Sequence, residues 1–110
     1  MRKEKSEWRV VWTPISKADI LEIGSYLSLI ASQATVESLL LSIHSAGEGL
    51  SHNPYLWRVR DDVLKEVRFA PLQSYFICYR IINVTTIEVL RIIHQRRDVA
   101  ALFADIDTQL

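Results

Sequence analysis

The last third of the chain, residues 75–103, constrains the fold most, because it alternates as two β-strands while staying apolar at almost every position. Residues 75–82 and 87–94 each show the two-residue period of a strand, and residues 83–86 form a turn between them. A strand with one solvated face carries polar residues at every second position. These two strands do not, so both faces of the hairpin are predicted to be covered.

Charged side chains interrupt this apolar surface. They are Arg80, Arg91 and His94, followed by Arg96, Arg97 and Asp98. Charged residues are almost never fully buried unless they are paired. We therefore expect these side chains to line an edge of the fold or to face a partner, with Asp98 acting as a helix cap or as the ion-pair partner of an arginine.

The first half of the chain predicts a short strand followed by two helices. Residues 8–12 alternate as a strand, and Thr13 with Pro14 forms a typical helix start. A break near residues 32–33 separates the first helix from a second, which runs from about Ala34 to about Gly47. Gly47 and Gly49 favour a left-handed stop.

Residues 63–70 predict a further strand, and residues 71–74 the turn after it. The predicted fold class is α+β: an N-terminal strand, an α-helical hairpin, a three-stranded antiparallel meander and a short C-terminal helix. The most regular apolar positions predict one core between the hairpin and the sheet. These positions are Leu27, Leu40, Ile43, Ile77 and Val89.

Length and composition agree with a single domain over residues 1–110, with flexible ends at 1–7 and 104–110. The lone cysteine, the charged N-terminus and the lack of a long apolar run indicate a cytoplasmic protein without a membrane segment. His44, His52 and His94 lack metal-ligand spacing, and no glycine-rich phosphate loop is present. The sequence therefore predicts no metal and no cofactor.

Charge is unevenly distributed although the formal net charge is zero. Residues 13–56 hold one lysine and four carboxylates, a net charge of −3, whereas residues 57–98 hold eight cations and five carboxylates, a net charge of +3. A neutral chain gains little long-range attraction to nucleic acid. A local basic face could still meet an acidic partner.

The ordered series of motifs resembles the RelE/ParE superfamily, the toxins of type II toxin–antitoxin modules, and the ParE branch most closely. The C-terminal part of the resemblance is Tyr-x-Ile-x-Tyr-Arg at residues 75–80, then Ile-Glu-Val-Leu-Arg-Ile-Ile-His-x-Arg-Arg-Asp at residues 87–98. The N-terminal part is Trp-Thr-Pro at residues 12–14 and Ala-Asp-Ile at residues 18–20, with Ile23 and Tyr26. The resemblance spans roughly residues 8–103.

This resemblance implies a plasmid-stabilising toxin that inhibits DNA gyrase without catalysis, is neutralised by a cognate antitoxin and forms a hetero-oligomer with it. The residues expected to contact the target are the basic set Arg58, Arg60, Arg91, His94, Arg96 and Arg97. The residues expected to contact the antitoxin are Tyr75, Ile77, Tyr79, Leu27 and Leu40.

Two alternatives stay open within the same superfamily. The first is a RelE-like endoribonuclease that cleaves mRNA on the ribosome, which needs cations for the phosphate and a general acid or base. Its candidate residues are Arg68, Arg80, Arg91 and His94, with Lys65 and Tyr75. The neutral net charge counts against it, and His94 could instead be a strand-end residue whose ring bonds the backbone. The second alternative is a non-toxic family member that only binds its antitoxin.

Overall fold

The computed structural model describes residues 7–97. Its elements are β1 (Arg9–Trp12), α1 (Pro14–Leu27), α2 (Gln33–Gly49), a 3-10 turn (Leu50–His52), β2 (Arg68–Leu72), β3 (Tyr75–Asn83) and β4 (Thr86–His94). The strands form one sheet in the order β1-β4-β3-β2, in which β1 runs parallel to β4 and the other pairs are antiparallel. The predicted α+β architecture is confirmed for these elements, while the predicted C-terminal helix and Asp98 lie outside the described residues.

Both helices begin with the side-chain caps that their sequences favour. Thr13 caps α1, and its hydroxyl accepts a hydrogen bond from the backbone N–H of Ser16 at 3.0 Å. Pro14 occupies the first turn, where a missing N–H costs nothing. Ser32 caps α2 in the same way, so this helix starts at Gln33 and slightly ahead of the predicted start.

The predicted left-handed glycine stop of α2 is wrong. No glycine of the described chain has a positive φ, and the chain passes from α2 directly into the 3-10 turn. Gly47 serves a different purpose, because a Cβ atom at this position would lie 2.2 Å from the ring of Trp12. The missing side chain lets β1 pack closely against α2.

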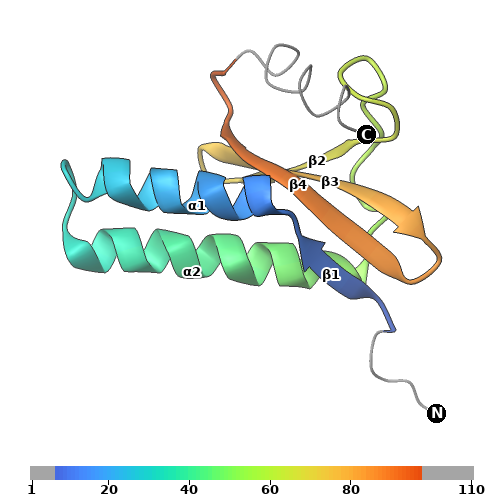
Figure 1. The fold of residues 1–110 in the computed structure, drawn as a ribbon, viewed down its shortest axis with the longest axis horizontal. Helices are drawn as coiled ribbons and strands as arrows, with labels where there is room; N and C mark the ends of the chain where they lie inside the picture. Colours follow the sequence, from blue (N-terminus) through green and yellow to red (C-terminus); the bar gives the residue numbers. More distant parts are fainter. Residues whose placement is uncertain (1–6, 98–110) are drawn as a thin grey trace.

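Each face of the sheet has its own apolar cluster, as the two-sided pattern predicts. The helices lie along one face (Figure 1), where Ile43, Ile77 and Val89 are completely buried. Leu27 and Leu40 pack against this cluster but are only half-buried. On the opposite face the segment before β2 contributes to a second cluster, whose buried members are Leu64, Val67, Phe69, Cys78, Leu90 and Ile93.

The predicted strand over residues 63–70 starts later than expected, at Arg68. The carboxylate of Asp61 accepts a hydrogen bond from the N–H of Glu66 at 2.6 Å, and Glu66 has a left-handed φ of 62°. This local turn competes with extended backbone. The strand then includes Pro71, which an edge strand tolerates.

Candidate functional site

The outer edge of β4 is completed by side chains of the α1 region. β1 pairs only with the first half of β4, from Thr86 to Val89. Beyond this point the hydroxyl of Thr13 donates to the carbonyl of Leu90 at 3.1 Å, next to a shift in the β3–β4 register. The carboxylate of Asp19 then accepts from the backbone N–H of Ile92 at 2.9 Å. Polar side chains of α1 and its cap thus replace a missing strand.

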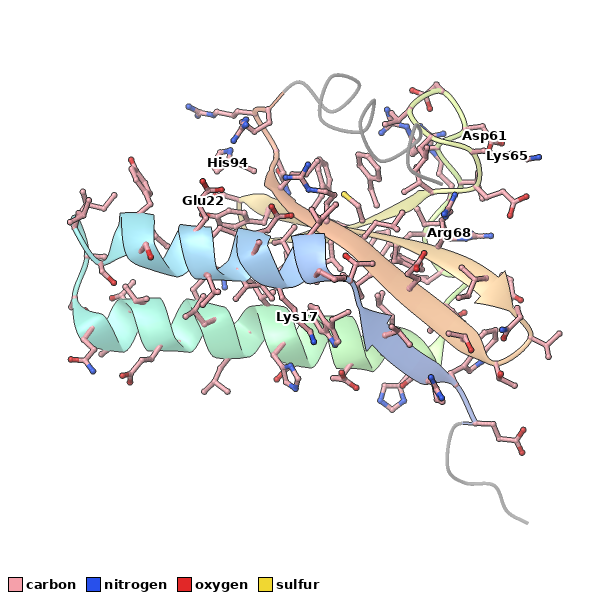
Figure 2. The ribbon with its side chains drawn as sticks, in the orientation of Figure 1. Lys17, Glu22, Asp61, Lys65, Arg68 and His94 are labelled. Carbon is pink, nitrogen blue, oxygen red and sulfur yellow. The ribbon has the colours of Figure 1, made fainter. Side chains whose placement is uncertain are left out.

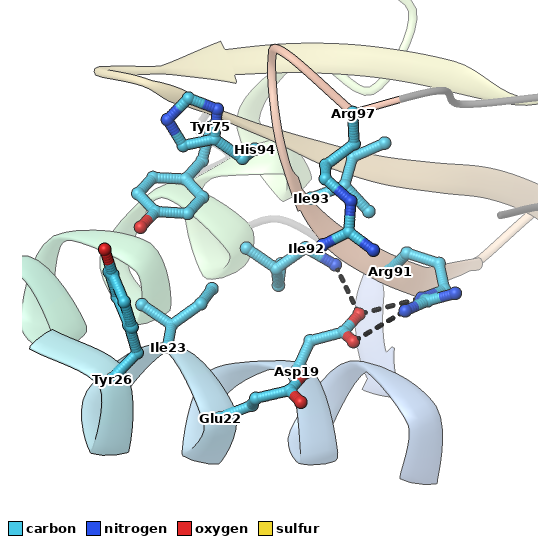
Figure 3. A pocket seen from close by; sticks show the side chains of 10 residues that line it. All are labelled: Asp19, Glu22, Ile23, Tyr26, Tyr75, Arg91, Ile92, Ile93, His94 and Arg97. Carbon is cyan, nitrogen blue, oxygen red and sulfur yellow. Dashed lines mark hydrogen bonds and ion pairs between the residues drawn. The ribbon is translucent and has the colours of Figure 1, made fainter.

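Asp19 also pairs with Arg91 in a two-pronged ion pair (Figure 3). The Arg91 Nε atom lies 2.9 Å from Asp19 Oδ2, and the Nη2 atom lies 2.8 Å from Oδ1. The hydrogen bonding that Arg91 donates to the carboxylate of Asp19 is the main cause that raises the pKa of Arg91 above its usual value. Arg91 therefore joins α1 to β4, and its expected role as a target contact stays a prediction.

A cavity of about 440 Å³ opens beside this ion pair, between α1 and the end of β4 (Figure 3). A second hollow of about 610 Å³ continues from it toward α2 and shares Tyr26, Tyr75 and His94 with the first. We call the two together the groove. Its lining residues are Asp19, Glu22, Ile23, Tyr26, Leu27, Ala34, Thr35, Ser38, Leu39, Gln73, Ser74, Tyr75, Arg91, Ile92, Ile93, His94 and Arg97.

His94 and Tyr75 face each other across the end of the hairpin. Their ring centroids are 5.3 Å apart in an edge-to-face arrangement. The Nδ1 atom of His94 accepts a hydrogen bond from the backbone N–H of Arg96 at 3.1 Å. His94 is thus a strand-end residue whose ring bonds the backbone, and its expected role in target contact or catalysis stays a prediction. Burial raises the pKa of Tyr75, with a smaller contribution from Tyr26.

The residues expected to contact an antitoxin separate into two groups. Tyr75 and Leu27 line the groove, whereas Leu40 does not line it and is a half-buried residue of α2 packed against the core. Ile77 and Tyr79 are completely buried under the helices, because alternate β3 side chains point into the core. The expectation that Ile77 and Tyr79 offer a contact surface is therefore wrong in this conformation.

The basic residues expected at the target also have different surroundings. Arg96 and Arg97 are exposed just after β4. Arg58 is exposed beside a hollow of about 390 Å³ on the face opposite the helices. Arg60 lines the same hollow but pairs with Asp62 at 3.0 Å.

The candidate ribonuclease residues do not converge. Arg68 donates to the backbone carbonyl of Trp57, and Arg80 lies 3.8 Å from Glu88 on the neighbouring strand. Figure 2 shows Lys65 and Arg68 well separated from His94. Of the four candidates, Arg91 and His94 line the cavity between α1 and the end of β4.

Asp19, Glu22 and Tyr26 are groove residues that the sequence did not single out as functional. A signal was present for Asp19, since it lies one turn before Ile23 on the apolar side of the helix. A carboxylate in an apolar stripe and an arginine in an apolar strand together suggest a pair.

Residues 7–97 contain no helix with the length and hydropathy that a membrane crossing requires. The same part of the chain contains no cluster of histidine, cysteine and carboxylate side chains suited to a metal ion.

Comparison with known proteins identifies the family. The sequence profile described as the ParE toxin of type II toxin–antitoxin systems, parDE, matches residues 10–99. A search of curated protein sequences gives no match.

Two solved structures share the fold. A chain of the chromosomal ParDE toxin–antitoxin system from P. aeruginosa is similar at 18% identity and a TM-score of 0.70, covering 80% of this chain and 96% of that one. A chain of the RelBE2 toxin–antitoxin complex from Mycobacterium tuberculosis is similar at 20% identity and a TM-score of 0.62, covering 79% and 96%. Because the family profile spans most of the sequence, this chain belongs to the ParE toxin family of type II toxin–antitoxin systems.

Proposed function

We propose that this chain inhibits DNA gyrase by binding it in the cytoplasm, without catalysing a reaction of its own. One observation supports a binding role over a catalytic one, because the candidate arginines lie against groups of the chain itself. Arg68 donates to the carbonyl of Trp57, Arg91 pairs with Asp19, and Arg80 lies 3.8 Å from Glu88. An arginine that clamps a reacting phosphate must present its guanidinium to the ligand. These three arginines face different parts of the protein instead.

The exposed cations suit the role of target contact. Arg96 and Arg97 project beyond the sheet, and Arg58 is exposed on the opposite face from the helices. Arginine is enriched among residues that dominate binding energy at protein interfaces. We therefore assign Arg96 and Arg97 to the main target contact, with Arg58 and Arg60 assisting.

A cognate antitoxin is the second partner that we propose, with the groove as its docking site. Apolar side chains of Ile23, Leu27 and Ile92 line the groove, and at the end of the helical hairpin Tyr26, Leu29 and Ile30 are more than half exposed. Exposed apolar surface of this kind marks interaction sites. The solved relatives come from a ParDE toxin–antitoxin system and from a RelBE2 toxin–antitoxin complex, which agrees with this assignment.

A ribosome-dependent ribonuclease remains the second candidate, and His94 alone favours it. The Nε2 atom of His94 makes no hydrogen bond within residues 7–97, and the ring lines a cavity beside Tyr75. Imidazole can act as an acid or base near neutral pH. However, the ion pair of Arg91 with Asp19 leaves the charge of that arginine compensated.

The test compares the two toxic mechanisms directly. Purified protein is added to gyrase, ATP and relaxed plasmid, and the proposed function predicts loss of supercoiling with accumulation of cleaved DNA. Controlled expression in cells should produce double-strand breaks before any loss of mRNA. Early mRNA cleavage with intact chromosomes would establish the ribonuclease instead. Antitoxin binding without growth arrest would identify a non-toxic family member.

A further inference from the structure

Two charged side chains of the groove have no ion-pair partner within residues 7–97. Glu22 lies on α1 and Arg97 follows β4, so the two charges lie on opposite walls (Figure 3). Both residues are exposed. Asp19 and Arg91 in the same cavity form an ion pair with each other. Glu22 makes only a minor contribution to the raised pKa of Arg91.

Apolar side chains lie between these walls. Ile23, Ile92 and Ile93 line the cavity that holds both charges, and the groove continues past Tyr26 and Tyr75 to α2. Such a shape accepts an amphipathic protein segment, whose apolar stripe meets the floor while its flanks meet the walls. Charged flanks of this kind decide partner choice and orientation where helices pack side by side.

We propose that Glu22 and Arg97 determine which antitoxin segment fits the groove and in which orientation. The segment carries a basic residue that faces Glu22, an acidic residue that faces Arg97, and an apolar stripe between them. This inference rests on the proposed role of the groove as the antitoxin site. It adds the charge pattern of the partner, which the fold alone does not specify.

The same pattern gives a physical route to neutralisation. Arg97 is both a wall of the groove and part of the proposed target contact. An antitoxin carboxylate paired with Arg97 removes this cation from the surface offered to the target. Like charges placed opposite each other across an interface are unfavourable, so antitoxins with the reversed pattern are rejected.

The experiment uses the full chain and the antitoxin encoded beside its gene. Affinity and association rate are measured for the parent, E22K and R97E. At about 50 mM salt each charge reversal should weaken binding on the order of tenfold. The loss should come mainly from a lower association rate constant, because exposed charges at the edge of an interface steer the two proteins as they meet. At about 0.5 M salt the differences should largely disappear, since screening shortens the range of exposed charges.

Matched controls carry the same charge changes outside the groove. E37K alters an exposed carboxylate of α2, and R58E alters an exposed cation of the opposite face; neither residue lines the groove. Both should bind within about twofold of the parent, as isolated surface charges contribute little. Circular dichroism and thermal unfolding show whether each variant is folded.

The outcomes separate this inference from the proposed function. If E22K and R97E bind as tightly as their controls, the charge pattern is wrong although the antitoxin site stands. If the parent does not bind the antitoxin, the proposed partner and this inference both fail. Restoration of E22K binding by reversing one basic residue of the antitoxin supports the inference and identifies the residue that faces Glu22.

Discussion

The middle of β4 and the end of β4 are neighbours along one strand, yet their charges have opposite surroundings. In the middle, Arg91 is enclosed and held by two hydrogen bonds to Asp19, whose side chain is only 8% exposed. At the end, Arg96 and Arg97 are exposed beyond the sheet. The first region, which we call the clasp, comprises Asp19, Arg91 and the Ile92 N–H; the second, the rim, comprises residues 94–97 with Glu22.

This difference in burial and pairing gives Arg91 a different role from Arg96 and Arg97. An ion pair inside the fold is costly to disrupt, because removing one partner leaves the other as a buried charge that water cannot solvate. An exposed charge contributes little to stability and stays available to a partner. The clasp should therefore control folding, and the rim should control recognition.

Removing the clasp carboxylate should have the largest effect on stability. Asp19→Ala leaves Arg91 without its paired anion and the N–H of Ile92 without its acceptor. We expect a loss of about 3–5 kcal/mol in the free energy of unfolding, measured by urea denaturation. Glu22→Ala, on the same helix, should change stability by less than about 0.5 kcal/mol. Equal losses in the two variants would contradict the distinction between clasp and rim.

Truncating the core between α2 and the sheet should have the next largest effect. Ile43 is completely buried between α2 and the sheet, so Ile43→Ala should cost about 2–5 kcal/mol in denaturant unfolding. Leu40→Ala should cost less, because Leu40 is only half-buried where it packs against this core. A larger loss at Leu40 than at Ile43 would contradict the placement of the core between α2 and the sheet.

Two glycines at the end of α2 test how tightly β1 is packed. A Cβ atom at Gly47 would overlap the ring of Trp12, which stacks on His44 and donates a hydrogen bond to Glu48 at 2.8 Å. Gly47→Ala should therefore cost about 1–3 kcal/mol. Gly49→Ala meets nothing within 4 Å and should be neutral or stabilise the helix by up to about 1 kcal/mol. Thermal unfolding of the pair distinguishes the steric effect from helix propensity.

Alkaline pH should lower the free energy of unfolding through a core residue, Tyr79, and not through the rim. Burial raises the pKa of Tyr79 to about 12, whereas an unfolded tyrosine ionises near 10. Stability is complete below the unfolded pKa and falls as the pH rises from about 10 to about 12, by up to about 1.4 kcal/mol per pH unit. Tyr79→Phe loses the hydrogen bond to the carbonyl of Pro54 at 2.8 Å but should show a shallower decline. An unchanged slope would exclude Tyr79 as its source.

The sequence predicted features that depend on local chemistry. Thr13 with Pro14 identified the start of α1, and the alternation of residues 75–94 identified both long strands and their two covered faces. The turn before β2 was missed, because the left-handed backbone of Glu66 depends on one side-chain hydrogen bond, from its N–H to the carboxylate of Asp61. The role of Gly47 also depends on Trp12, which is far away in the chain.

The candidate site was only partly predictable for the same reason. The rim residues Arg96 and Arg97 are exposed, as expected for charged residues that follow the last strand, and this expectation needed no tertiary information. Arg91 differs because its partner Asp19 lies in another element, and sequence patterns give no register between α1 and β4. Ile77 and Tyr79 show the converse problem, since an apolar strand pattern does not reveal which residues a helix covers.

Removing both rim arginines should have the smallest effect on folding and a complete effect on toxicity. Arg96 and Arg97 are exposed, so the double change Arg96→Ala with Arg97→Ala should alter the free energy of unfolding by less than about 0.5 kcal/mol. Growth arrest should nevertheless disappear, because these cations form the main proposed target contact. Arg58→Ala is the matched control and should reduce toxicity only partly. If growth arrest persists without both rim arginines, the target contact lies elsewhere, and the exposed face of the helical hairpin, with Leu21 and Leu41, becomes the next surface to alter.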